Sequence, residues 1–160
     1  MDESSVYLDT SSIVKRYVEE RGSRLVDRIY AEAETGRRTI AMSLWNIGEV
    51  LGAFDRCCSR RVMGEDDLRK AVGAFLAESQ KMIRLGGMLI LPFSAEIMTE
   101  TYALILKHHI YQADALQIAT CKMAGSTLFV SGDTRLLGVA RDEKIRALNV
   151  EKAEEDATQP

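Results

Sequence analysis

The sequence has few of the features that mark linkers, disulfide frameworks or membrane anchors. Only two of the 160 residues are proline, and no stretch rich in Pro, Gly or Ser divides the chain, so we predict no linker. The three cysteines are odd in number and lack metal-type spacing, which favours packing roles in a reducing compartment. Because no signal peptide and no membrane-spanning apolar run is found, we expect a cytoplasmic protein without membrane contact.

A surplus of positive charge is also missing. The 21 Lys and Arg residues are outnumbered by 24 Asp and Glu residues, and the net charge of −3 argues against nucleic-acid binding through bulk charge. A nuclease remains compatible with this total, because an acidic metal site lowers it. The hydrophobic share of 46% is enough for an apolar core. We predict one domain over residues 1–150 and a flexible acidic tail over residues 151–160.

Short apolar runs alternate with helical patterns along the chain. Five runs predict strands, the last of them at a sheet edge: Val6–Leu8, Thr39–Met42, Met88–Leu91, Thr127–Val130 and Ala147–Val150. The runs are continuously apolar, as expected for parallel strands covered on both faces. The intervening patterns predict helices, including one from Thr10 to Val18 and a long one from Glu65 to Arg84. We therefore predict an α/β fold, a three-layer α/β/α sandwich with a mainly parallel central sheet.

Four acidic residues are predicted at one edge of this sheet. Asp9 directly follows the first strand, and Asp133 follows the fourth. Ligand sites of open parallel sheets form beyond the carboxyl ends of the strands. Glu49 and Asp114 lie early in helices that pack against the sheet, and crossover geometry places those helix starts at the same edge. The sequence thus predicts a pocket lined by four carboxylates.

Such a pocket requires protons or cations. Two carboxylates about 4 Å apart repel by about 4 kcal/mol at an effective dielectric near 20. Ligands that are all oxygen favour Mg²⁺ or Mn²⁺ over zinc, which prefers nitrogen and sulfur. A hard divalent ion of this kind can acidify a water and bridge a phosphate oxygen, which is the chemistry of phosphodiester hydrolysis.

Each acid also has a purely structural interpretation. Asp9 can cap a helix, and Asp133 can be a turn residue. Asp114 can serve only the helix dipole, and Glu49 can be an exposed helix residue. The convergence of all four acids at one edge favours the metal site over four independent accidents.

The segments around these acids resemble the PIN-domain family, in particular its VapC-like ribonuclease toxins. The matching segments, in order, are Val6–Lys15, Ser43–Val50, Tyr111–Thr120 and Leu128–Leu137. The resemblance implies an Mg²⁺- or Mn²⁺-dependent endoribonuclease that acts on RNA, forms homodimers and is blocked by a small antitoxin protein. By position it makes Asp9, Glu49, Asp114 and Asp133 the catalytic metal-binding acids. The helix over residues 65–84 and the acidic tail make the chain longer than a minimal toxin of this kind.

For several other residues near the acids, the sequence predicts a role less specifically. Thr10 and Ser131 match positions where the family has hydroxyl residues beside the acids, and Arg135 is a candidate phosphate contact. Trp45 can stack on a base, although a core or dimer-face role is expected more often. His108 and His109 are expected to be loop residues near a helix end.

Other functional classes fit the sequence less well. A phosphotransferase of the haloacid-dehalogenase kind needs a second Asp where this chain has Ser11. A response-regulator receiver needs an acidic pair and a later Lys that do not occur in the required places. The remaining alternative is a PIN-fold protein without turnover that binds RNA or a protein partner.

Overall fold

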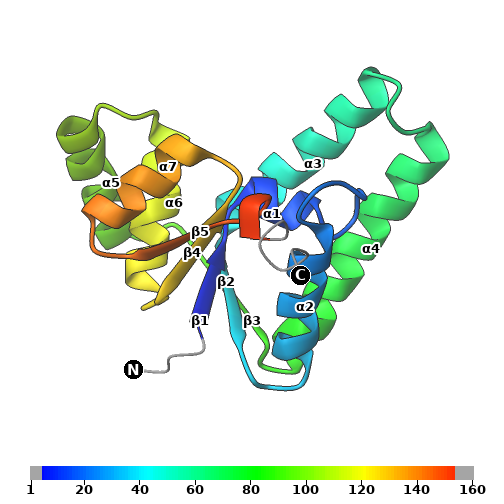
Figure 1. Ribbon diagram of the computed structural model, residues 1–160, viewed down its shortest axis with the longest axis horizontal. Helices are drawn as coiled ribbons and strands as arrows, with labels where there is room; N and C mark the ends of the chain where they lie inside the picture. The colour runs from blue at the N-terminus through cyan, green and yellow to red at the C-terminus, as the bar shows by residue number, and fades with distance from the viewer. Residues whose placement is uncertain (1–4, 154–160) are drawn as a thin grey trace.

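A computed structural model of the protein describes residues 5–153 and has a five-stranded sheet at its centre (Figure 1). The strands are β1 (Ser5–Leu8), β2 (Thr39–Ser43), β3 (Met88–Leu91), β4 (Leu128–Ser131) and β5 (Arg146–Asn149). Their order is β3-β2-β1-β4-β5, and every neighbouring pair is parallel. The predicted parallel sheet is confirmed, with the last strand at an edge.

Helices cover both faces of this sheet. They are α1 (Thr10–Val14), α2 (Ser23–Glu34), α3 (Leu44–Ser59), α4 (Glu65–Arg84), α5 (Ala95–His108), α6 (Gln112–Met123) and α7 (Thr134–Asp142). Figure 1 shows α5, α6 and α7 on one side and α1 to α4 on the other, with α3 and α4 extending outward as a long hairpin. The predicted three-layer α/β/α sandwich is confirmed.

The side chains of each strand alternate between two apolar cores. In β1, Val6 and Leu8 pack in the core formed with α1 to α4, whereas Tyr7 packs in the core formed with α5, α6 and α7. All three side chains are fully buried. The strands show no polar alternation because both faces of the sheet are covered.

The first helix is shorter than predicted, and most of the predicted acidic tail lies outside the described residues. Helix α1 ends at Val14 instead of reaching Val18, and a turn in which the Tyr17 amide donates to the Val14 carbonyl at 3.0 Å follows it. This tight turn keeps Tyr17 and Val18 packed against the core without further helix. Of the expected acidic tail, only residues 151–153 are described, and the remainder lies outside the described residues.

None of the helices within residues 5–153 has both the length and the apolar character needed to cross a membrane. Helix α4, the longest, instead carries three acidic residues in its first turn and two basic residues in its last turn. That distribution complements the helix dipole and matches the sequence prediction for residues 65–84.

Candidate active site

The carboxyl ends of the strands border a cavity of about 530 Å³. Strand β1 leads directly to Asp9, and β4 leads through Gly132 to Asp133. The starts of α3 and α6 supply Glu49 and Asp114. The four acids predicted from sequence all line this cavity, which we call the acidic pocket; its other lining residues include Thr10, Ser11, Lys15, Glu20, Arg56, Gln117 and Glu151.

Asp9 is the most buried acid of the pocket, with 4% of its surface exposed. Its carboxylate accepts hydrogen bonds from the Ser12 amide at 2.9 Å and from the Ser131 hydroxyl at 2.5 Å. The Ser11 hydroxyl lies 2.8 and 2.9 Å from the two carboxylate oxygens. Burial raises the pKa of Asp9, while the hydrogen bonds from Ser131, Ser12 and Ser11 act in the opposite direction.

Two of the four acids cap helices. The bond from the Ser12 amide makes Asp9 the N-cap of α1, and Asp133 caps α7 by accepting from the amides of Arg135 and Leu136. Both bonds to Asp133 end on Oδ1, at 2.8 and 3.2 Å. The capping interpretation of Asp9 therefore holds alongside the pocket position, because a carboxylate has more acceptor sites than one cap uses.

Glu49 is held by a polar network that begins inside the protein. Its Oε2 accepts from the Thr10 hydroxyl at 2.6 Å and from the Gln117 amide at 3.1 Å. Asn46, which is fully buried, donates to Thr10 Oγ1 and to Gln117 Oε1, both at 2.9 Å. The same Asn46 accepts through Oδ1 from the Tyr7 hydroxyl at 3.0 Å and from the Ser43 amide at 2.7 Å. Asn46 therefore connects the sheet to both residues that orient Glu49.

Asp114 is the acid most affected by its neighbours. Burial raises the pKa of its carboxyl, and the charges of Asp133 and Glu49 raise it further, whereas Arg135 lowers it. Within residues 5–153, no donor forms a hydrogen bond with this carboxylate. Asp114, Asp133 and Glu49 all line the acidic pocket, so a cation bound there would favour the ionised form of Asp114.

The donor set of the pocket fits a hard divalent cation held partly through water. Carboxylates and hydroxyls line the pocket, and neither His nor Cys is among its lining residues in the described part of the chain. As the side chains stand, no three His, Cys, Asp or Glu groups within residues 5–153 are close enough to enclose an ion. Local donors hold Asp9, Asp133 and Glu49. Mg²⁺ keeps several waters and needs only one or two direct carboxylates, so the all-oxygen donor set is compatible with this ion.

Basic residues are present but mostly engaged. Lys15, which is 5% exposed, donates to Glu20 at 3.0 Å and to Glu151 at 3.1 Å in the pocket wall. Arg135 is exposed and donates to the His109 carbonyl at 2.9 Å. Its guanidinium influences Asp114 without lining the pocket, and its contact with phosphate remains a prediction.

Sequence reasoning missed the residues that position the acids. Asn46 and Gln117 were not singled out, although each lies three residues from a predicted acid on the same helix. Residues three apart share a helix face, so a search for polar side chains at that spacing from Glu49 and Asp114 would have found both. Ser11 and Lys15 have no comparable signal, because each also contacts a residue from the far end of the chain, Gly132 and Glu151 respectively.

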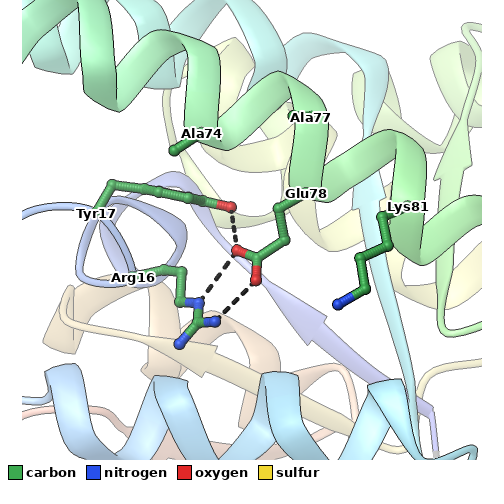
Figure 2. A pocket seen from close by; sticks show the side chains of 6 residues that line it. All are labelled: Arg16, Tyr17, Ala74, Ala77, Glu78 and Lys81. Atoms are coloured by element: carbon green, nitrogen blue, oxygen red, sulfur yellow. Dashed lines mark hydrogen bonds and ion pairs between the residues drawn. The ribbon is translucent and has the colours of Figure 1, made fainter.

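A second cavity, of about 470 Å³, lies between the turn after α1 and helix α4 (Figure 2). Figure 2 shows Glu78 of α4 accepting from the Arg16 guanidinium and from the Tyr17 hydroxyl. The distances are 2.7 and 3.1 Å from Arg16 and 2.8 Å from Tyr17. Arg16 also donates to Asp27 of α2 at 2.6 Å. Every polar group shown in this cavity is either paired or exposed, so we assign these contacts to holding the hairpin against the domain.

Replacing Glu78 by Gln should lower the free energy of unfolding by about 1–2 kcal/mol near neutral pH, because charge-assisted hydrogen bonds are lost. Burial raises the pKa of Glu78, but the bonds from Arg16 and Tyr17 outweigh it and leave the pKa below its ordinary value. A carboxyl with a lowered folded-state pKa stabilises the fold above its unfolded-state pKa, and this contribution is lost as pH falls through the folded value. Urea unfolding should therefore show a gap between variant and wild type that narrows in acid.

The matched control is Glu34→Gln. Glu34 of α2 pairs with Lys81 of α4, the helix that also carries Glu78, but the side chains of Glu34 and Lys81 are 46% and 50% exposed. Solvent screening limits such a pair, so the change should stay below about 0.5 kcal/mol. Equal losses in both variants, at every pH, would contradict the assignment of Glu78.

Comparison with known proteins agrees with this architecture. A family model described as "PIN domain" matches residues 6–142. No curated protein matches the sequence significantly. Among solved structures, PAE2754 from Pyrobaculum aerophilum is 16% identical, with a TM-score of 0.57 and coverage of 98% of each chain.

Two further structures come from described toxin systems. A toxin–antitoxin complex from Klebsiella pneumoniae is 14% identical, with a TM-score of 0.58, over 91% of this chain and 97% of that one. The toxin VapC20 of Mycobacterium tuberculosis, described as cleaving the sarcin–ricin loop, is 17% identical, with a TM-score of 0.58, over 82% of this chain and 92% of that one. At these identities the similarity establishes the shared fold.

Proposed function

The chain belongs to the PIN-domain family, and from this premise we propose that it is a metal-dependent endoribonuclease that hydrolyses RNA phosphodiester bonds. The observation that carries the proposal is the acidic pocket, which collects carboxylates from four separate segments at the carboxyl edge of the sheet. We further propose that residues 1–150 act as one nuclease domain in the cytoplasm.

In this proposal Asp9, Glu49, Asp114 and Asp133 hold Mg²⁺ or Mn²⁺. When bound, such an ion supplies an activated water and neutralises charge on the phosphate oxygens. Thr10 and Ser131 orient the acids, since their hydroxyls donate to Glu49 and Asp9 respectively. Arg135, exposed at the start of α7, is assigned to an RNA phosphate.

The charge of the pocket explains why a cation is required. Six acidic residues line it (Asp9, Glu20, Glu49, Asp114, Asp133 and Glu151), against two basic ones (Lys15 and Arg56), an excess of four negative charges. The Lys15 ammonium group pairs with one carboxylate oxygen of Glu20 and one of Glu151, so this lysine can bind a phosphate only by giving up these partners. An RNA phosphate would therefore be repelled from the pocket until a cation offsets these charges.

We assign the protein to the toxin side of a toxin–antitoxin pair. The support is its similarity in fold to the Klebsiella pneumoniae complex and to VapC20. The assignment carries two predictions about partners, a small antitoxin protein that blocks the acidic pocket and a homodimer. Co-expression with the product of an adjacent small reading frame, followed by purification of a complex, tests the first.

The experiment that tests the nuclease is RNA cleavage with controlled metal. Purified protein should cleave single-stranded or structured RNA with Mn²⁺ or Mg²⁺, and cleavage should stop with EDTA or with Asp9→Asn. Asp66→Asn is the matched control, because Asp66 is 82% exposed at the start of α4, outside the pocket. Cleavage that survives EDTA would remove the proposed mechanism.

A second candidate, a PIN-fold protein that binds RNA or a protein without turnover, is favoured by one observation. No three acidic groups in the described part of the chain are close enough to chelate an ion as they stand. Metal binding without cleavage, across a broad panel of RNAs, would select this candidate.

A further inference from the structure

Arg56 of α3 carries a positive charge in the pocket wall that the proposed chemistry does not use. It lines the acidic pocket together with Lys15, which is buried and paired with two glutamates. Arg56 is instead exposed, and within residues 5–153 its guanidinium forms no hydrogen bond or ion pair. An arginine has five N–H donors and no acceptor. Arg56 can therefore offer its donors to an anion without giving up a partner.

The Arg56 side chain is directed back along α3, toward the part of the helix that carries Glu49. Long side chains of an α-helix lean toward the N-terminus and lie over the preceding turn. Accordingly, a Cβ atom placed on Gly52, four residues earlier, would lie 3.4 Å from Arg56 Nη1. Ala53, which lines the pocket between Glu49 and Arg56, is also small. The small residues at positions 52 and 53 leave the guanidinium room beside the pocket.

Interaction with the helix dipole does not explain this placement of the charge. Arg56 is the basic residue in the last turn of α3, where a positive charge near the terminal carbonyls is favourable. Those carbonyls lie toward the C-terminal end of the helix, whereas the guanidinium lies beside Gly52, one turn toward the N-terminus. The dipole would favour the opposite direction, so the placement suits a ligand at the pocket better than the end of the helix.

An RNA strand at the pocket would bring phosphates to both of its sides. Between Glu49 and Arg56 the backbone of α3 advances by about 10 Å, and the side chain that folds back shortens this separation. On the other side, Arg135 at the start of α7 is already assigned to an RNA phosphate. Figure 1 shows α3 and α7 on opposite sides of the sheet. A strand that crosses the acidic pocket can therefore contact Arg135 on one side and Arg56 on the other.

We propose that Arg56 binds the RNA phosphate next to the scissile one, on the α3 side of the acidic pocket, an inference that rests on the proposed function. The planar guanidinium presents two parallel N–H groups that match two phosphate oxygens. Every nucleotide carries a phosphate, so this contact positions the strand and does not select its bases. Arg56 is accordingly a substrate-binding residue that holds the neighbouring phosphate while the acids act at the scissile one.

Binding of a fluorescently labelled single-stranded RNA, measured by anisotropy with Mg²⁺ at several salt concentrations, tests the proposal. The titrations use Asp114→Asn protein, in which we expect slow cleavage, so that the RNA stays intact. Adding Arg56→Gln should weaken binding about tenfold, as expected for one charge-assisted contact. It should also reduce the slope of log K against log salt concentration by about 0.7, the value for one phosphate on a single strand.

Two further variants separate this contact from other effects of the charge. Arg56→Lys should keep the salt slope and lose part of the affinity, because an ammonium group keeps the charge but not the paired donors. Arg84→Gln is the matched control, since Arg84 is an exposed basic residue in the last turn of the long helix α4, outside the pocket. It should bind RNA with the affinity and salt slope of the parent protein.

Failure of this inference is distinguishable from failure of the nuclease. If the wild type cleaves RNA with Mn²⁺ but Arg56→Gln changes neither affinity nor salt slope, the phosphate contact is overturned and the nuclease stands. If Arg56→Gln has the expected effects and no metal supports cleavage, the contact stands and the nuclease is lost. Equal losses in Arg56→Gln and Arg84→Gln would indicate general attraction to RNA and overturn the proposal. Weaker binding of a polyglutamate peptide by Arg56→Gln, with RNA affinity unchanged, would assign Arg56 to an acidic protein partner and also overturn it.

Discussion

Replacing Asp114 by Asn should reduce RNA cleavage by roughly 100-fold or more, in keeping with the several kcal/mol that a positioned divalent ion contributes. The same change should make the metal-free protein more stable, by about 0.5–1 kcal/mol near neutral pH. Burial and the charges of Asp133 and Glu49 raise the pKa of Asp114, so its ionised form is disfavoured in the folded protein. Removing the charge relieves that cost and, in the proposed mechanism, removes a metal-binding group.

The sign of the pH dependence distinguishes this explanation from a packing effect. A carboxyl with a raised folded-state pKa favours the fold most when it is protonated, and the fold loses stability as pH rises from the unfolded-state value through the folded value. The stability gap between Asp114→Asn and wild type should therefore be present near neutral pH and close in acid. Urea unfolding in EDTA at several pH values measures it. A variant less stable than wild type at neutral pH would contradict the electrostatic account.

Metal binding supplies an independent measurement of the same site. Any ligand that binds only the folded state stabilises it, by about 2.7 kcal/mol at a hundred times its Kd. Mn²⁺ should therefore raise the Tm of the wild type and of the exposed control Asp66→Asn, and should raise that of Asp114→Asn much less. Equal shifts in all three proteins would place the ion elsewhere.

Replacing Asn46 by Ala should lower the free energy of unfolding by about 3–5 kcal/mol, the largest loss of stability that we expect from one polar side chain here. Asn46 makes four hydrogen bonds inside the protein, two as donor and two as acceptor. Alanine would leave the Tyr7 hydroxyl and the Ser43 amide without their partner, and both residues are almost completely buried. A buried polar group without a partner destabilises the fold by more than the net stabilisation that its hydrogen bond had contributed.

Urea unfolding compares this variant with Asn149→Ala. The Asn149 side chain also accepts two hydrogen bonds, from the amides of Glu151 and Lys152, but at the surface end of β5. Water can replace it there, so the loss should be about 1 kcal/mol. Similar losses in the two variants would mean that burial of the Asn46 network adds nothing to stability.

Much of the fold could be predicted from the order of residues alone. Continuous apolar runs such as Thr39–Met42 identify strands buried on both faces, and the helical spacing of the long segment over residues 65–84 matches α4 at both ends. These signals are local, since they depend on the period of apolar residues and on residues that begin or end helices. The prediction failed after Val14, where Tyr17 and Val18 keep helical spacing but turn contacts end α1.

By itself, the sequence determined the parallel three-layer sandwich and the placement of Asp9, Glu49, Asp114 and Asp133 at one edge of it. Strand ends and helix starts follow from local patterns, and the carboxyl ends of parallel strands lie at the same edge of a sheet. Only the tertiary structure decided how those acids are held. The Asn46 network and the buried Lys15 join segments far apart in the chain, and local periodicity contains no information about such contacts. It also decided that Trp45 faces solvent, since exposure of an apolar residue depends on which neighbours the completed fold brings against it.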